Sequence, residues 1–229
     1  MTSALHAPAL GLRTRRYLPS DYPNLRAAMQ EAYAGLGGDV PDEAELARLH
    51  ALYPDGQLVV TVGGRFAGAT LSRVVPFATY RRHHTIAERL DPSRYRDDAA
   101  TGETVYVLDV FVPTAFRLQN VGRLCAAAVR AQAFADNAAR VIGVSPIPGY
   151  RAHAAELDAD SYVARVRGGQ LTDPALSFQF ALGATDFGVF PGYNMGDLPS
   201  CGYGVGVTVV NPTYDPSRRF ASQTLGRSG

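Results

Sequence analysis

The spacing of hydrophobic residues along this chain predicts strands that alternate with helices. Apolar residues at every second position, or in short β-branched runs, indicate strands, and apolar residues three or four positions apart indicate helices. The strand pattern occurs at residues 12–17, 57–62, 66–74, 105–112, 140–144, 187–190 and 203–210. The helical pattern occurs at residues 22–34, 41–52, 122–138 and 173–183. This order favours a mixed α/β sheet.

Turn residues support several of these boundaries. Gly63-Gly64 separates two strand segments and is a typical hairpin signal. A group of glycines, Gly35, Gly37 and Gly38, is expected to end the first helix. The segment 105–112 (VYVLDVFV) has the densest strand pattern, so we expect it to lie in the centre of the sheet.

The chain is predicted to form a single domain. Its 229 residues can bury a sizeable core, and no linker or repeat divides them. We expect a flexible N-terminal arm at residues 1–11, a domain at residues 12–212 and a C-terminal tail at residues 213–229.

The polar stretch from residue 76 to residue 102 has no clear periodicity. It is expected to form a loop or a short helix that borders a substrate cleft. It contains His83-His84, a pair that could ligate a metal, but no third ligand lies at a useful spacing. We therefore interpret both as exposed loop histidines.

Composition and charge exclude several classes of function. A formal net charge of +1 gives no long-range attraction to nucleic acid or to an anionic membrane. The two cysteines match neither a metal site nor a disulfide framework. The first residues do not resemble a signal peptide, and no apolar run is long enough to span a bilayer. A cytoplasmic protein without nucleic-acid or membrane partners is expected.

A strand, a loop and a helix follow one another in the segment VYVLDVFVPTAFRLQNVGRLCAAAVRAQ. The start of a helix presents unpaired N–H groups and a partial positive charge, which can hold a pyrophosphate. Arg117 and Arg123 flank the predicted helix start and could grip phosphate oxygens. Such units are common, so this pattern alone only permits an anion site.

The same segment resembles the acyl-CoA signature of GNAT acetyltransferases. That signature reads Gln or Arg, two residues, Gly, one residue, then Gly or Ala. Arg117 and Gly122 match it, whereas Asn120 occupies the position of the first glycine. Asparagine tolerates a positive φ better than most residues, so the shape of the loop can survive. Val112-Pro113 and Phe116 also match the family pattern.

The resemblance implies a GNAT fold over residues 12–212, with a central, mostly antiparallel sheet of about seven strands flanked by helices. It implies acetyl-CoA or another acyl-CoA as co-substrate and permits a homodimer. The implied cofactor-binding residues are Val110, Phe111, Val112, Arg117, Leu118, Gln119, Asn120, Val121, Gly122 and Arg123. In the family, backbone N–H groups of the central strand hold the pantetheine and the thioester carbonyl, which here assigns that role to residues 110–112.

The C-terminal half resembles a narrower branch, the GNAT domains fused to or beside nitrilase-type carbon-nitrogen hydrolases. The matching residues are Pro148-Gly149-Tyr150, Tyr162-Val163, GQLTDPALSFQ at 169–179, Pro191–Tyr193, Asp197, Ser200, Gly202-Tyr203 and Asn211-Pro212. Two features depart from the branch: its late tryptophan is missing, and no hydrolase domain follows within these residues.

Several residues are candidates for the acid–base chemistry. Strand alternation predicts that Tyr106, Leu108, Val110 and Val112 share one face and that Asp109 and Phe111 share the other. The family places a general base at the positions of Tyr106 or Leu108. At the position of Gln179 it has a tyrosine that acts as the general acid. Because glutamine cannot supply that proton, the catalytic candidates are Tyr106, Asp109 and Tyr150, with His153 and Tyr193 as further alternatives.

These observations favour an N-acyltransferase that acts on a small amine or an amino-acid-like metabolite. Two alternatives remain open. One is a catalytically inactive GNAT fold that serves as a binding or sensing module, which the residues Asn120 and Gln179 motivate. The other is an acyltransferase supplied by an acyl carrier protein.

Overall fold

Seven strands form one sheet in the order β1-β2-β3-β4-β5-β7-β6. The computed structural model describes residues 11–34, 41–117 and 119–220. The strands are β1 Leu12–Arg16, β2 Leu58–Val62, β3 Arg65–Val75, β4 Thr104–Phe111, β5 Arg140–Pro146, β6 Thr185–Phe190 and β7 Gly204–Val210. The helices are α1 Tyr22–Tyr33, α2 Glu43–Leu52, α3 Phe77–Tyr80, α4 Ile86–Arg89, α5 Tyr95–Thr101, α6 Val121–Ala135, α7 Ala159–Arg167 and α8 Leu176–Ala181.

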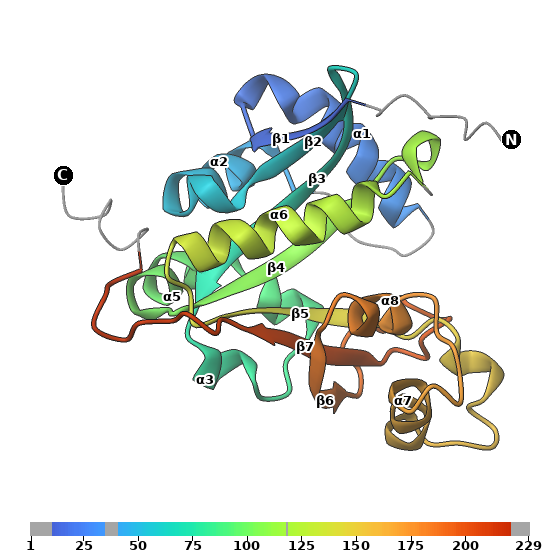
Figure 1. The fold of residues 1–229 in the computed structure, drawn as a ribbon. Coiled ribbons are helices and arrows are strands. Elements are labelled where there is room, and N and C mark those ends of the chain that lie inside the picture. The colour runs from blue at the N-terminus through green and yellow to red at the C-terminus, as the bar shows by residue number, and fades with distance from the viewer. Residues whose placement is uncertain (1–10, 35–40, 118, 221–229) are drawn as a thin grey trace, which may run out of the picture.

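The sheet is antiparallel except at its centre, where β4 and β5 run parallel. This confirms the mixed, mostly antiparallel sheet. The β4–β5 ladder is short, because only Thr104–Tyr106 pair with Arg140–Ile142. Beyond that point β5 continues along β7 while β4 continues along β3, so the two central strands diverge (Figure 1).

A β-bulge in β4 lies next to the point of divergence. Asp109 pairs with Leu71 and Val107 pairs with Ser72, so Leu108 has no opposite residue on β3. A bulge adds one residue and reverses the alternation of side chains beyond it. The prediction that Tyr106, Leu108, Val110 and Val112 share one face is therefore wrong, whereas Asp109 and Phe111 do share a face, opposite Leu71 and Ala69 of β3. Leu108 and Phe111 pack with α1 and α2, whereas Val110 and Val112 pack with α6.

Helix α6 covers one face of the sheet, and α1, α2 and α5 cover the other. Val129 and Ala133 of α6 pack on Val74 and Val105, and Cys125 packs near Val60. On the opposite face, Leu25 and Met29 of α1 pack with Leu46, Leu71 and Leu108. A further cluster beside β5 and β7 joins α7 to α8 through buried residues that include Tyr162 and Leu176. The core therefore covers both faces of the sheet. Helix α8 packs beside β5, near the place where β4 and β5 diverge (Figure 1).

Local capping explains where two helices differ from the sequence-based expectation. Helix α6 ends at Ala135, before residue 138, because Asn137 adopts φ 65° and Ala138 N–H donates to the Ala133 carbonyl at 2.8 Å. This is a left-handed helix C-cap. Helix α8 begins at Leu176, later than residue 173, because Asp173 Oδ1 accepts from the N–H groups of Ala175 and Leu176.

Two further segments correct the expectations. Helix α7 was not predicted, although Asp158 caps it and Ala159, Tyr162, Val163 and Val166 form a buried face at helical spacing. The polar stretch 76–102 contains three short helices, α3, α4 and α5.

The N-terminal arm and the helix-ending glycines at 35–38 lie outside the described residues. Residues 213–220 lie against the domain, where Phe220 packs on Tyr53 and Asn137 donates to the carbonyls of Asp215 and Arg218.

Candidate functional site

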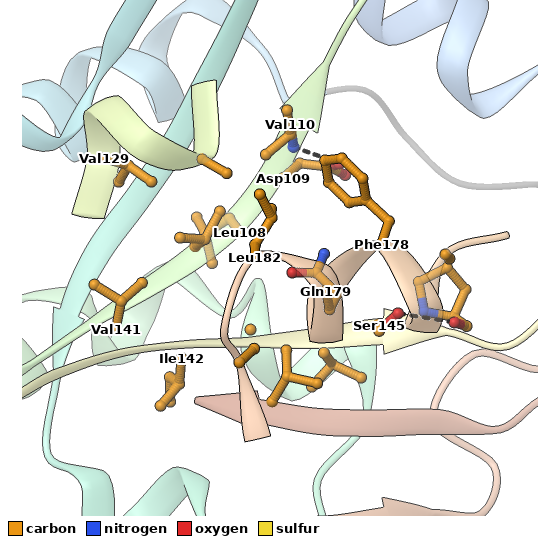
Figure 2. Close-up of a pocket in the computed structure, with 18 of the residues that line it drawn as sticks. Leu108, Asp109, Val110, Val129, Val141, Ile142, Ser145, Phe178, Gln179 and Leu182 are labelled. Carbon is orange, nitrogen blue, oxygen red and sulfur yellow. Dashed lines mark hydrogen bonds between the residues drawn. The ribbon is translucent and has the colours of Figure 1, made fainter. Parts of the chain in front are cut away.

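The gap between β4 and β5 contains a cavity of about 420 Å³. Residues 107–110 of β4 and 141–146 of β5 form two of its walls, and α6 and α8 contribute others. Figure 2 shows Asp109 and Val110 on β4, Ser145 on β5, and Phe178 and Gln179 of α8 reaching into the space between the strands. The divergence of the central strands is therefore what creates the cavity.

Asp109, with Asp197, is one of the two carboxylates that line this cavity among the described residues. Its Oδ2 accepts a short hydrogen bond from the Tyr33 hydroxyl, and its Oδ1 accepts from the Val110 N–H at 2.8 Å. Burial, reinforced by the Asp109 charge, raises the pKa of Tyr33, so this phenol stays protonated and donates. Each carboxylate oxygen keeps a free lone pair for a substrate.

Helix α4 and the loop after β6 form a buried end of the cavity. Thr85 and Glu88 form a reciprocal capping box that starts α4, and Ile86 N–H donates to the Tyr193 carbonyl at 2.9 Å. This arrangement places Arg89 and Tyr193 in the cavity wall. Arg89 is 5% exposed, and its guanidinium carbon lies 5.8 Å from the centre of the Tyr193 ring.

Tyr106 and His84 form a hydrogen-bonded pair behind that wall. The His84 ring lies with Nδ1 2.8 Å from the Arg82 carbonyl and Nε2 2.8 Å from the Tyr106 hydroxyl. Because a carbonyl only accepts, Nδ1 carries the proton and Tyr106 donates to Nε2. Burial lowers the pKa of His84 and raises the pKa of Tyr106 well above its usual value. The prediction that His84 is exposed is wrong, since it is 5% exposed.

The N-terminus of α6 lies at another end of the cavity. Asn120 adopts φ 61° and ψ 9°, the left-handed conformation for which glycine is usual in the signature. A second hollow, lined by residues that include Arg117, Asn120, Gly122, Arg123 and Phe178, opens here. Gly122 and Phe178 also line the main cavity, so the two spaces meet at these residues.

The predicted cofactor-binding residues occupy different positions around these two spaces. Val110 lines the main cavity, while Val112, Arg117, Asn120, Val121 and Arg123 line the second hollow. Phe111 is 1% exposed and packs against Tyr33. The Gln119 side chain donates to the Ala115 carbonyl at 3.0 Å, and Leu118 lies outside the described residues. The Val110 N–H, expected to face a thioester, is held by Asp109 in this structure.

Of the three predicted catalytic residues, the structure places only Asp109 in the cavity wall. Tyr106 lies behind it, as described above. Tyr150 lies in the cluster around α7, where its hydroxyl donates to the Leu157 carbonyl at 3.1 Å. Among the alternatives, Tyr193 lines the cavity together with Gln179, whereas the His153 ring packs against Tyr162.

Two residues of the cavity, Tyr33 and Arg89, were not anticipated from the sequence. Tyr33 ends α1, and only the tertiary fold brings it to Asp109. Arg89 ends a four-residue helix within the polar stretch. The pattern Thr85-x-x-Glu88 is a capping-box signature and could have indicated that helix.

Other chemistries find less support in the described part of the chain. Burial raises the pKa of the Cys125 thiol to about 12, which disfavours the nucleophilic thiolate. No three His, Cys, Asp or Glu side chains gather as a metal site among the described residues. None of the described helices has the length and apolar character needed to cross a bilayer.

Comparison with known proteins identifies the family. The GNAT-like decarboxylase GphF, solved with isobutyryl-CoA, is 30% identical, with a TM-score of 0.68 over 86% of this chain and 98% of that one. An uncharacterised N-acetyltransferase of Bacillus subtilis, YkwB, is 28% identical over 89% of this chain and 90% of its own length. No family model matches the chain. The similarity to GphF, together with the sheet topology, shows that the chain belongs to the GNAT superfamily of acyltransferases.

The narrower branch beside nitrilase-type hydrolases is not shown. A probable hydrolase of Bacillus subtilis, YhcX, is 28% identical over 72% of this chain, but the match spans only 32% of that protein. This chain therefore covers about a third of that relative, and its membership of the branch stays a prediction.

Proposed function

We propose that the protein is an acyl-CoA-dependent N-acyltransferase that transfers an acetyl or longer acyl group to the amine of a small or amino-acid-like acceptor. The observation that carries this proposal is the cavity between the diverging strands. It extends from Gly122 at the start of α6, past Asp109 on β4, to Arg89 and Tyr193. Such a cavity can hold a thioester that enters past Gly122 together with an amine beside Asp109.

The start of α6 suits the pyrophosphate of the co-substrate. The N–H groups of the first helical turn are directed toward the second hollow, and Arg117 and Arg123 line it. The pantetheine would then pass Gly122 and Phe178 into the gap between β4 and β5. A solved relative that is 30% identical holds isobutyryl-CoA, which supports this class of ligand.

Asp109 is the residue best placed to accept the proton of the acceptor amine. A protonated amine gives one proton to the carboxylate, and the neutral amine attacks the thioester carbonyl carbon. The tetrahedral intermediate then collapses: the C–S bond breaks, the attacking nitrogen loses its extra proton to become the amide, and the departing CoA sulfur takes up that proton. Cavity walls that hold both reactants together supply a large part of the rate increase.

The oxyanion of the intermediate needs a donor, and the Val110 N–H is the candidate on β4. Because Asp109 Oδ1 already accepts from this N–H at 2.8 Å, the carboxylate must release it when the thioester binds. The Asp109 side chain thus couples the acceptance of the proton to the release of the Val110 N–H group.

A second candidate function is decarboxylation of an acyl-CoA. It is favoured by the 30% identity to a GNAT-like decarboxylase. In that reaction the bond between a carboxylate and the α-carbon breaks, carbon dioxide leaves, and the resulting enolate takes up a proton. The inactive binding module and the carrier-protein-dependent acyltransferase are further alternatives, and homodimer formation and a cytoplasmic location stay predictions.

The decisive experiment combines binding with turnover. Calorimetry with acetyl-CoA and longer acyl-CoAs should show binding, and release of free thiol with an amine panel should show transfer. Arg117→Ala with Arg123→Ala should weaken binding by about 2–4 kcal/mol, on the order of two charge-assisted hydrogen bonds. The matched control is Arg26→Ala with Arg48→Ala, two exposed arginines on α1 and α2.

The outcomes separate the candidates. Binding without transfer to any amine would favour the sensing module, and release of carbon dioxide from malonyl-CoA would favour the decarboxylase. If no acyl-CoA binds, the carrier-protein alternative gains. If the double variant binds as tightly as its control, the pyrophosphate does not lie at the start of α6.

A further inference from the structure

A buried arginine in the cavity wall has no carboxylate partner among the residues that the structure describes. Arg89 is 5% exposed and lines the cavity. Its Nη1 donates to the Leu108 carbonyl at 2.5 Å, while its Nε is buried without a hydrogen-bond partner. Among the described residues, none of the ion pairs within 4.0 Å includes Arg89. A guanidinium removed from water in this way is costly unless something compensates its charge.

Arg73 on β3 is also buried, and it shows how the charge of a buried arginine is usually compensated. Arg73 is 3% exposed and forms an ion pair with Asp98 at 2.8 Å, and it stacks on the Tyr95 ring at 4.6 Å. Asp98 is itself buried. The described residues therefore supply a carboxylate to Arg73 and none within ion-pair distance of Arg89.

The groups around Arg89 in the described part of the chain leave its Nε without a hydrogen-bond partner. The Tyr193 ring lies beside the guanidinium, and the Tyr193 hydroxyl is buried next to Tyr106. Asp109, which also lines the cavity, acts on Arg89 only through its charge, because the two form no ion pair within 4.0 Å. Nε and Nη2 form one edge of the guanidinium, the edge that binds a carboxylate with two parallel hydrogen bonds.

We propose that Arg89 binds a carboxylate of the substrate inside this cavity, an assignment that rests on the proposed acyl-CoA-dependent function. The carboxylate can come from either reactant. An amino-acid acceptor would place its carboxylate on Arg89 and its amine toward Asp109. A dicarboxylic acyl group would place its free carboxylate there instead. In both cases the ligand supplies the counter-charge that the chain itself does not.

A structural role alone does not account for this arrangement. The bond from Nη1 to the Leu108 carbonyl holds the bulge of β4, but it uses one of the five N–H groups of the guanidinium. A neutral side chain with a single donor would hold the bulge at lower cost in desolvation.

The test compares ligands that differ only in the carboxylate. Calorimetry in the presence of free CoA measures the affinity for α-amino acids and for their α-carboxamides, which keep the amine and lose the negative charge. A second series compares malonyl-CoA and succinyl-CoA with butyryl-CoA. The proteins are the wild type, Arg89→Gln, Arg89→Lys and, as matched control, Arg82→Gln, which alters an exposed arginine on the same segment.

The wild type should bind the carboxylate member of at least one series about 10- to 100-fold more tightly, as expected for a charged hydrogen-bonded pair. Arg89→Gln should reduce that ratio to about one, Arg89→Lys should keep part of it, and Arg82→Gln should keep all of it. The ratio is taken within one protein, so general destabilisation cancels. The series that responds identifies which reactant carries the carboxylate.

The proposal is overturned if the wild type shows no preference in either series, or if Arg89→Gln keeps the wild-type ratio. If Arg89→Gln does not fold, the ratio in the wild type decides. Failure of the proposed function looks different: the carboxylate preference would persist while no amine is acylated. Acylation that proceeds equally with acids and carboxamides, and equally from malonyl-CoA, succinyl-CoA and butyryl-CoA, would instead overturn the role of Arg89 and leave the acyltransferase standing.

Discussion

The carboxylate of Asp109 lies where several demands of the proposed reaction meet. It accepts hydrogen bonds from Tyr33 and Val110, and it faces the space that a thioester would enter. The bulge at Leu108 turns Asp109 onto the face that α1 covers, where Tyr33 meets it. Its position therefore depends on a local irregularity of the strand.

Substitution of Asp109 tests its role as the proton acceptor. Asp109→Asn keeps the size of the side chain and an oxygen for the Val110 N–H, but removes the charge and the basicity. We expect kcat/KM to fall by about 10²- to 10⁴-fold, the range for a positioned general base, with acyl-CoA affinity little changed. Thiol-release kinetics and calorimetry measure the two quantities. The control is Asp97→Asn, an exposed carboxylate on α5. A loss of less than about threefold would show that another group, or water, takes the proton.

At the scale of single residues, the sequence identifies chemistry but not proximity. Tyr106 is a candidate because the family places a base at its position, and Asp109 is an alternative because glutamine stands where the family has its acid. The structure keeps Asp109 in the cavity wall and places Tyr106 behind it, with its hydroxyl bound to His84. Arg89 could not be foreseen, because its importance lies in the absence of a neighbouring carboxylate, and only the folded arrangement shows that.

At the scale of helices and strands, the hydrophobic pattern predicts some features and misses others. The hydrophobic spacing predicts β4 and α6 and the loop between them, since each has a clear period. It cannot reveal the bulge, because the residue types of a bulged strand are the same as those of a regular strand. It also cannot reveal the divergence of β4 from β5, which arises because each strand pairs more extensively with its other neighbour.

The loop before α6 offers a prediction about the signature itself. Asn120 holds φ 61°, a conformation that glycine adopts at lower cost, and its side chain makes no capping hydrogen bond. Asn120→Gly should therefore leave acyl-CoA affinity equal or better, because it removes a side chain beside the expected phosphates. Calorimetry against acetyl-CoA provides the measurement. A clear loss of affinity would mean that the asparagine side chain binds the ligand directly.

The close approach of α6 to β3 gives a second prediction at this scale. A Cβ added to Gly68 would lie 2.8 Å from Val121 Cγ1 and 2.9 Å from the Phe111 carbonyl oxygen. Gly68→Ala should push the start of α6 away from the sheet and destabilise the protein by about 1–3 kcal/mol, as overpacking does. Urea unfolding measures the stability. The control is Gly11→Ala, where the added Cβ meets nothing within 4 Å. Equal stability of both variants would contradict the close packing of α6 on β3.

For the molecule as a whole, the order of elements carried most of the information. Two early helices, hairpin strands, a central strand followed by a long helix, and a late helix between strands already matched the GNAT order, and the sheet confirms it. Helix α7 is not predicted, and the stretch expected to form a loop or a short helix contains α3, α4 and α5. All four are short helices whose formation depends on capping and on burial against the rest of the fold.

The dependence of stability on pH tests the buried end of the cavity as part of the whole fold. Burial lowers the pKa of His84 below its ordinary 6.5, and the nearby Arg89 acts in the same direction. Below about pH 6.5 the unfolded chain therefore binds a proton that the folded chain binds only at lower pH. By linkage, the stability that neutral His84 contributes is fully present above pH 6.5 and is lost as the pH falls through the folded-state pKa.

His84→Gln isolates this contribution. Glutamine can accept the Tyr106 hydrogen bond but does not titrate, so the variant should be less stable than the wild type at pH 7.5 and the gap should narrow by pH 5.5. Urea unfolding at the two pH values measures the gap, and contributions from carboxylates elsewhere cancel in the difference between the proteins. His83→Gln is the control, because it leaves the burial of His84 and both of its hydrogen bonds in place. A gap that stays constant or widens toward pH 5.5 would mean that His84 takes up its proton in the fold as readily as in the unfolded chain, and that the wall behind Arg89 is open to water.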